Sequence, residues 1–483
     1  MIKFSFIKES LFYTIGNALP MLASVILLPF YANLLTTTNY VALSFYIGIA
    51  ILFQIIFSFS FEQYYGVIYT EVKHSDEKIK VLNGSVLLFL IMYGTLLTLI
   101  LLPFGNQILS YIFDKDIPVI FFPYGLLSVL TGFLNAVFKI LMTTYIYSQK
   151  PKTFFLSNFI NFLATVILSL SGLYIFPDSL IGPIYGRFLS GLVIVLFNTI
   201  ILKNNILWKI DFNFIKETIY KSSALFGTSL TLWITANIDR YFLKNYIDVN
   251  LLASYDLIMK CFVGVEFIQN GLSMAIISKV FDVWKKENKV NFNITSNRYF
   301  NVFILSTTAF IVVFTFILPL FIQLIIKEEK YYTAFDLIGL IAVAYILRNN
   351  IYSYNFALLY SKKTNVIFLS NVISVLIQVI INYLFIPKYG LIVAIYAYTI
   401  ARLINILLFH FYVKKSVEFN INYLKWYGIT IISSVLFILS YYYFPSNYLL
   451  NYFVIMLIFF VIVMFIYKNE VDNLIRRTKF KIF

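Results

Sequence analysis

The stretch Asn237-Ile238-Asp239-Arg240-Tyr241-Phe242-Leu243 closes one long apolar run, and Ala253-Ser254-Tyr255-Asp256 and Lys260 open the next. Asp239, Arg240, Asp256 and Lys260 thus lie in or beside segments that otherwise suit a lipid bilayer. A charge at the centre of a membrane helix costs about 2.5–3.5 kcal/mol. Charged residues at that depth usually face a bundle interior or a water-filled cavity. The stretch therefore predicts membrane helices arranged around a charged interior.

The composition of the 483 residues agrees with this prediction. Hydrophobic residues make up 61% and charged residues only 12%, with a mean hydropathy of +0.85. Soluble proteins are about 25% charged, so the chain is predicted to be an integral membrane protein. The net charge of +15 does not indicate nucleic-acid binding, because the basic residues fall in short loops. One cysteine and two histidines exclude disulfide frameworks and histidine-rich zinc sites, and no cofactor is expected.

The apolar runs predict about fourteen membrane helices, since each crossing needs roughly 20 apolar residues. The runs lack the alternation of β-barrel strands, so the predicted fold class is an all-α polytopic membrane protein. The predicted helices span residues 11–33, 41–69, 84–103, 118–147, 153–176, 180–202, 221–243, 251–280, 299–326, 334–360, 365–386, 390–413, 425–444 and 448–467.

Charges in the loops predict the orientation of these helices. Every second loop is rich in lysine and arginine, as at residues 73–80, Lys362-Lys363 and the tail with Arg476 and Arg477. The loops between them are nearly bare, as at Thr36-Thr37-Thr38-Asn39. Basic loops stay in the cytoplasm, so both termini are predicted to be cytoplasmic, in a bacterial cytoplasmic (inner) membrane.

An internal repeat predicts the domain organisation. Tyr147-Ser148-Gln149-Lys150 followed by Phe155-Leu156-Ser157-Asn158 matches Tyr360-Ser361-Lys362-Lys363 followed by Phe368-Leu369-Ser370-Asn371. Both matches have the same offset, since 360 − 147 = 213 and 371 − 158 = 213. We therefore predict two six-helix lobes in parallel repeat, at 1–210 and 211–418, and an additional helix pair with a cytoplasmic tail at 419–483.

Ten charged residues within the predicted helices are the candidate functional residues. The basic ones, Lys139, Arg187, Arg240, Lys260, Arg348 and Arg402, exceed the acidic ones, Glu62, Asp239, Asp256 and Glu266. A cavity with this positive excess would attract an anion. A structural role competes for several of them: Asp256 and Lys260 are spaced to pair on one helix face, and Arg240 is placed to snorkel. Arg348 and Arg402 are near mid-span, where a cavity role is favoured.

No pattern of catalytic residues stands out, and the chain is not expected to be an enzyme. It contains no phosphate-cradling glycine loop, no histidine-based triad and no large segment outside the predicted helices. Without an ATPase motif, transport by this chain would be passive or driven by a gradient.

Two segments resemble the Wzx-type polysaccharide flippases, which move O-antigen and capsule repeat units and belong to the multidrug/oligosaccharidyl-lipid/polysaccharide exporter superfamily. One is Ala236-Asn237-Ile238-Asp239-Arg240-Tyr241-Phe242-Leu243 with Leu252-Ala253-Ser254-Tyr255-Asp256, which resembles the start of the second lobe. The other is Leu34-Leu35-Thr36-Thr37-Thr38-Asn39-Tyr40, which resembles the first outer loop, with Val41 where glycine is usual. The additional helices at 425–467 are similar to the lipid II flippase branch.

The resemblance implies a fold and a function. It implies two six-helix lobes around a V-shaped cavity, alternating access, and an undecaprenyl-diphosphate-linked oligosaccharide as cargo. The cationic lumen of such flippases fits Arg187, Arg348 and Arg402. Partners consistent with the family are membrane lipids, a coupling ion (H⁺ or Na⁺), a polysaccharide polymerase and a chain-length regulator.

Two alternative functions remain open from the sequence. A multidrug or small-molecule antiporter of the same superfamily would have the same fold, although a cation carrier would favour an acidic lumen and residues 11–33 contain no acid. A membrane polysaccharide polymerase or glycosyltransferase would usually need a large outer loop with catalytic residues, and the predicted outer loops are short.

Overall fold

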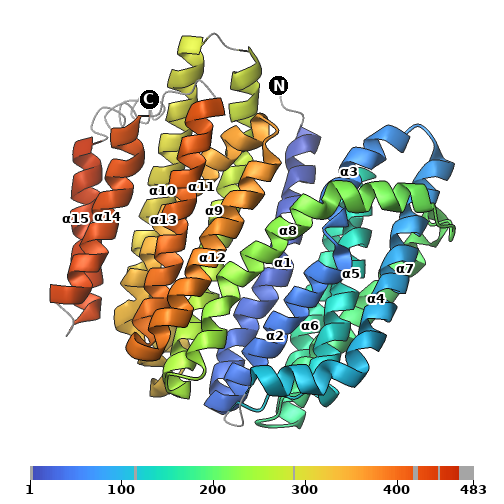
Figure 1. Cartoon of the computed structure of the whole chain (residues 1–483), viewed down its shortest axis with the longest axis horizontal. Helices are drawn as coiled ribbons and strands as arrows, with labels where there is room; N and C mark the ends of the chain where they lie inside the picture. The colour runs from blue at the N-terminus through green and yellow to red at the C-terminus, as the bar shows by residue number, and fades with distance from the viewer. Residues whose placement is uncertain (1–3, 114–116, 287–288, 417–421, 444–446, 467–483) are drawn as a thin grey trace. The chain divides into compact units, whose positions relative to one another are not determined.

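The computed structural model describes residues 4–113, 117–286, 289–416, 422–443 and 447–466. These residues are almost entirely helical and contain no strand (Figure 1). Twelve helical segments within the described residues are long and apolar enough to cross a membrane. Helices α8 (Phe212–Leu243) and α9 (Val249–Lys286) are as long as these twelve segments but more polar than they are. The prediction of an all-α polytopic membrane protein with about fourteen long helices is confirmed. The predicted basic tail lies outside the described residues.

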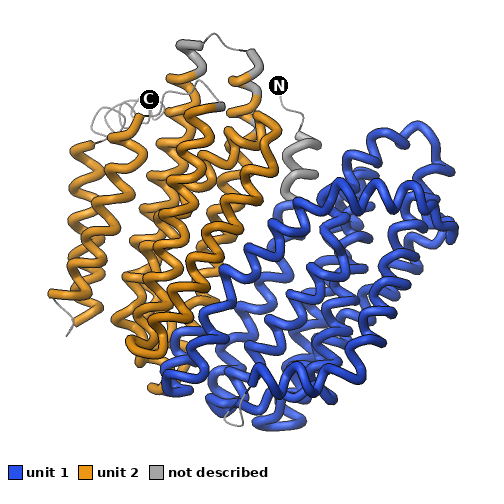
Figure 2. The backbone as a smooth tube through the Cα atoms, viewed as in Figure 1, with its two compact units in different colours: residues 1–256 blue, residues 257–483 orange. Residues whose placement is uncertain are grey.

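The chain divides into two compact units, residues 1–256 and residues 257–483 (Figure 2). The division falls inside α9, whereas the repeat in the sequence places a lobe boundary between residues 210 and 211. The difference arises because α8 packs against α2, α3 and α4 of the first unit. The lobe boundaries deduced from the repeat therefore stay a prediction.

Seven further helices form the first unit together with α8. Three of these helices begin at a polar residue whose side chain caps exposed backbone N–H groups. Thr36 caps α2, Ser75 caps α4 and Asp211 caps α8 by accepting hydrogen bonds from backbone N–H groups. The elements are α1 (Phe4–Leu34), α2 (Thr37–Ser58), α3 (Phe61–Val72), α4 (Asp76–Ile112), a π-helical turn (Phe121–Gly125), α5 (Leu126–Tyr147), α6 (Pro151–Ile175), α7 (Ile181–Leu202) and a 3₁₀ turn (Lys203–Asn205).

A break divides the second predicted helix into α2 and α3. Phe59 and Ser60 both adopt left-handed backbone conformations, with φ of 46° and 54°. The two hydroxyl oxygens of Ser60 and Ser229, on α8, lie 3.1 Å apart, and Gln63 donates to Ser229 over 3.3 Å. Partners on a neighbouring helix thus accompany the interrupted backbone, as non-helical segments at membrane depth require.

Small residues allow α6 and α7 to pack with their backbones in contact. A methyl group added at Gly172 would lie 2.5 Å from the Cα atom of Gly182, and one added at Gly186 would lie 2.6 Å from the Cα atom of Ser169. Close approach through small residues is a common means of associating helices in lipid, where the hydrophobic effect contributes little.

The second unit is built around α11 (Ile338–Tyr360), which is the most enclosed of the twelve apolar segments, at 83% buried. Helices α10, α12, α13 and α14 all contact it. The elements of this unit after α9 are α10 (Lys289–Ile325), two 3₁₀ turns (Glu329–Tyr332 and Phe335–Leu337), α11, α12 (Thr364–Tyr389), α13 (Leu391–Ser416), α14 (Tyr423–Tyr443) and α15 (Tyr448–Ile466).

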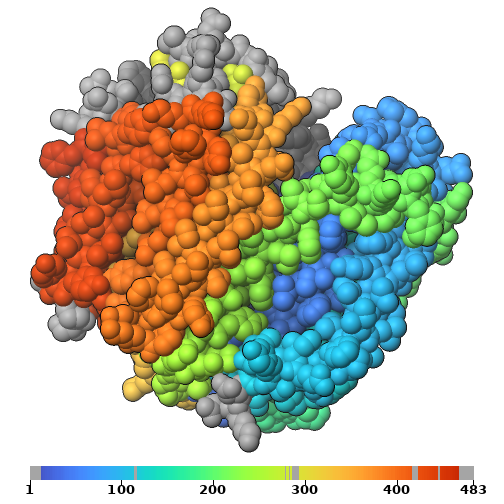
Figure 3. Space-filling model, in the orientation of Figure 1, coloured from blue at the N-terminus to red at the C-terminus, as the bar shows by residue number. Residues whose placement is uncertain are grey.

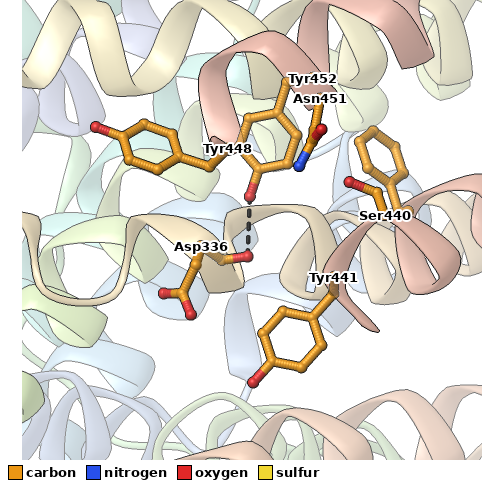
Figure 4. Close-up of a pocket in the computed structure, with 7 residues that line it drawn as sticks. Asp336, Ser440, Tyr441, Tyr448, Asn451 and Tyr452 are labelled. Atoms are coloured by element: carbon orange, nitrogen blue, oxygen red, sulfur yellow. Dashed lines mark hydrogen bonds between the residues drawn. The ribbon is translucent and has the colours of Figure 1, made fainter. Parts of the chain in front are cut away.

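The additional pair α14 and α15 is joined to the second unit by polar contacts. Asn350 on α11 donates to Thr430 over 2.9 Å. The hydroxyl of Tyr452 accepts a hydrogen bond from the N–H of Gly339 and donates to the carbonyls of Phe335 and Asp336. A pocket of about 10 Å³ adjoins this contact (Figure 4). Apolar side chains of the pair, such as Phe465 at 79% exposure, form a surface suited to lipid. The pair is drawn in red in the space-filling view (Figure 3).

The repeated sequence motif forms the same turn twice. Helices α5 and α11 end 213 residues apart, and the third residue of each motif, Gln149 or Lys362, is left-handed with φ of 54° or 56°. Lys150 N–H donates to the Tyr145 carbonyl, and Lys363 N–H donates to the Leu358 carbonyl, both over 2.9 Å. This pattern is a Schellman cap, so the repeated residues have a defined structural role.

Candidate functional site

Eight of the ten candidate residues form three charged groups in the structure. Glu266, Arg348 and Arg402 gather in the second unit. Glu62 pairs with Lys139 in the first unit, and Asp239, Arg240 and Asp256 form a third group there. Arg187 and Lys260 lie on α7 and α9.

The group in the second unit centres on Arg348 of α11. Its guanidinium forms an ion pair with Glu266 of α9, and the two side chains are 16% and 27% exposed. The guanidinium carbon lies 5.4 Å from the ring centre of Tyr352, one turn further along α11. Tyr352 in turn donates a hydrogen bond to Asn270. Arg348 is thus held between an acid and an aromatic ring, at a partly exposed position.

Arg402 on α13 has a different environment from Arg348. Arg402 is 9% exposed as a whole residue, and its Nη2 donates to the Tyr398 hydroxyl over 2.8 Å. The guanidinium carbon also lies 4.9 Å from the centre of the Tyr398 ring. Its Nε is buried without a hydrogen-bond partner, and no acid pairs with Arg402 among the described residues. An enclosed guanidinium therefore retains hydrogen-bonding capacity for an additional group.

Three tyrosines join these charges into one cluster. Arg348 is within electrostatic range of Glu266, Tyr345 and Tyr398, and Tyr352 is within range of both arginines. The ring centres of Tyr345 and Tyr398 lie 6.2 Å apart. The three charges were identifiable from the sequence, but the tyrosines were missed. Their helical spacing was the available signal, because Tyr345 and Tyr352 flank Arg348 by one turn each and Tyr398 precedes Arg402 by one turn.

The cluster is chemically suited to an anion. Two guanidinium groups and one carboxylate leave one positive charge in excess, in helices that are mostly enclosed by protein or lipid. Electrostatic attraction is stronger there than in water. Guanidinium forks also match the geometry of phosphate and carboxylate oxygens.

The first unit contains a comparable acid–base pair. Lys139 Nζ on α5 lies 2.7 Å from Glu62 Oε1 on α3, with side-chain exposures of 44% and 7%. Glu62 and Lys139 lie in the second and fourth predicted helices of the first lobe. Glu266 and Arg348 lie in the second and fourth predicted helices of the second lobe. Lys139 is the more accessible base of the two pairs.

The third group is a buried network at the junction of α8 and α9. Arg240 Nε lies 3.0 Å from Asp256 Oδ1, which also accepts a 2.7 Å hydrogen bond from Ser44 of α2. Asp239 accepts hydrogen bonds from the Tyr255 hydroxyl and from the Arg240 N–H. Both aspartates are 1% exposed. These contacts agree with a structural role for this stretch, in which Arg240 is paired with a buried acid.

Arg187 and Lys260 are both half-buried. Arg187 lies on α7, its Nε has no hydrogen-bond partner, and no ion pair with it occurs among the described residues. Lys260 lies on α9, one turn after Asp256. No group of three metal-ligating side chains occurs in the part of the chain that the structure describes.

The structure of the chain is similar to those of known transporters. The lipid II flippase MurJ in an inward closed conformation matches 96% of this chain and 100% of its own, at 15% identity and a TM-score of 0.70. An inward-facing multidrug resistance MATE transporter of the MOP superfamily matches 82% and 95%, at 11% identity and a TM-score of 0.64. A MOP superfamily transporter from Pyrococcus furiosus matches 84% and 95%, at 14% identity and a TM-score of 0.57.

These similarities show a fold shared with MurJ and the MATE transporters, and hence a multi-pass membrane protein. No curated protein sequence matches the chain. A family model described as polysaccharide biosynthesis protein matches residues 6–277, which is more than half of the chain. The resemblance noted from the sequence is thereby confirmed at the level of the family and of the fold, and the chain belongs to the polysaccharide biosynthesis protein family.

Proposed function

We propose that the chain is a flippase that moves undecaprenyl-diphosphate-linked oligosaccharide repeat units from the inner to the outer face of the cytoplasmic membrane. The carried glycan would serve an O-antigen, a capsule or a related surface polysaccharide. Membership of the polysaccharide biosynthesis family and the MurJ-like fold support a lipid-linked cargo. Transport would follow alternating access, as the transporter fold suggests, rather than a catalysed reaction.

The observation that carries this proposal is the cluster of Arg348, Arg402 and their tyrosines within the helices of the second unit. A diphosphate linkage has negative charge that must cross the hydrocarbon layer, where an unpaired charge is very costly. Two guanidinium groups can compensate that charge and hold several phosphate oxygens. In this proposal Arg348 and Arg402 are the main contacts, and Arg187, Lys139 and Lys260 are supporting basic residues. Arg240, which is paired with Asp256, has a structural role instead.

The cargo is tested by deleting the gene and analysing lipid-linked glycans by mass spectrometry. We expect undecaprenyl-diphosphate-linked oligosaccharide to accumulate and surface glycan to be lost, because the linked unit stays on the cytoplasmic face. Complementation with the intact gene should reverse both effects. Normal surface glycan together with altered resistance to toxic cations would instead support the antiporter alternative.

The predicted orientation is tested by labelling single cysteines in a Cys261→Ser background. His74, Lys362, Glu328 and Lys388 are exposed positions in loops or at helix ends. The positive-inside rule predicts that an impermeant thiol reagent added to intact spheroplasts labels cysteine at 328 and 388 but not at 74 and 362. All four should react after permeabilisation. Labelling at 74 or 362 from outside would contradict cytoplasmic termini.

A further inference from the structure

The two arginines of the cluster differ in what holds them. Arg348 is paired with Glu266, whereas Arg402 donates to the Tyr398 hydroxyl, lies over the Tyr398 ring and forms no ion pair among the described residues. The Arg402 Nε is buried without a hydrogen-bond partner. An anion that enters the cluster therefore finds one arginine with hydrogen-bonding capacity and one that is already occupied by an acid.

The Glu266–Arg348 pair is also more accessible than the pair of Arg240 with Asp256. Its side chains are 27% and 16% exposed, whereas Asp256 beside Arg240 is 2% exposed. A buried pair that loses one partner leaves a costly uncompensated charge. The Glu266 side chain is less enclosed than that of Asp256, so an unpaired charge on it costs less and the Glu266–Arg348 pair can separate more readily.

We propose that Glu266 is an internal competitor for the cargo: it occupies Arg348 when no anion is bound, and the anion must displace it to contact both arginines. This inference rests on the proposed function, because it assigns a regulatory role within the same cluster. The charge balance agrees with it. With Glu266 in place the cluster has one net positive charge, whereas the two arginines without it match the two phosphates of a diphosphate.

Such competition favours turnover over affinity. A carrier must bind its cargo on one face and release it on the other, and very tight binding would slow the release step. An acid that returns to Arg348 when the cargo leaves lowers the affinity and promotes release. Glu266 would thus set the balance between binding and transport rate, although it makes no favourable contact with the cargo itself.

The test measures binding and transport in the same variants. Wild-type protein in lipid nanodiscs is titrated by calorimetry with inorganic pyrophosphate and with farnesyl diphosphate, and glycan export is measured in cells. Removing the competing charge in Glu266→Gln is expected to tighten binding of both probes about tenfold. Export should fall below the wild-type level because release is slower. Glu266→Asp keeps the charge but shortens its reach, and it should tighten binding by about threefold.

Glu217→Gln is the matched control, because Glu217 forms an exposed ion pair with Lys221 on α8. It should leave binding and export unchanged. Unchanged or weaker binding by folded Glu266→Gln, or by Glu266→Asp where the glutamine variant does not fold, would overturn the inference. If wild-type protein binds neither probe, the diphosphate role in the proposed function fails instead, so the two failures are distinguishable.

Discussion

Replacing Arg402 by glutamine is expected to abolish or sharply reduce glycan export while the protein remains folded and inserted. Arg402 is enclosed and makes no ion pair with any described residue, so its removal leaves no acid uncompensated. The loss of one charge-assisted contact to a phosphate costs about 1.5–3 kcal/mol, or roughly ten- to hundredfold in affinity. Surface glycan and the affinity for pyrophosphate in nanodiscs are the two measurements.

Two further variants make this experiment specific. Arg402→Lys keeps the charge without the guanidinium fork, so it should restore export only in part. Arg298→Gln removes an exposed arginine from α10 of the same unit and should behave like wild type. Equal export by the wild type and by Arg402→Gln at matched membrane abundance would remove Arg402 from the proposed diphosphate site.

Replacing Arg240 by methionine is expected to destabilise the first unit by about 3–5 kcal/mol. The substitution removes the guanidinium that contacts Asp256 and belongs to the residue directly after Asp239. The carboxylates of Asp239 and Asp256, each 1% exposed, then lack this positive charge. Hydrogen bonds from Ser44 and Tyr255 remain but do not neutralise the charge. Thermal unfolding in detergent and the amount of inserted protein should both report the loss.

The comparison for this second prediction is Lys221→Met, which breaks an exposed pair with Glu217. Exposed pairs contribute about 0.2–1 kcal/mol, so this variant should unfold close to the wild-type temperature. Adding Asp256→Asn to Arg240→Met removes one of the uncompensated charges and should recover part of the stability. Wild-type stability of Arg240→Met would contradict the structural role assigned to the network.

Much of the fold is predictable from the sequence, because hydropathy determines where membrane helices form. All fourteen predicted spans correspond to observed helices, and several begin or end within a few residues of the prediction. The break at Phe59 and Ser60 was not predictable, because neither residue is a glycine or a proline. The extension of α4 and α10 beyond their apolar runs was missed because polar helical turns can continue past the hydrocarbon region.

The candidate site is predictable in its residue types but not in its pairings. Burial cost alone identifies Arg348 and Arg402 as unusual, because few charges occur in apolar segments. Which acid pairs with which base depends on helix packing, and Glu62–Lys139 and Glu266–Arg348 each join residues that are far apart in the chain. Whether any of these residues contacts a cargo stays a prediction that the variants above test.

The contacts of the last two helices have a consequence for how the protein is made. Tyr452 supplies the partner of the Gly339 N–H, and it is translated 113 residues later. At about 5–20 residues per second, the ribosome needs roughly 6–23 s to reach it. During that interval the start of α11 and the amide of Asn350, whose partner Thr430 also comes late, lack their final hydrogen bonds. A chain released early, after α13, would lack the partners of the Gly339 N–H and of the Asn350 amide.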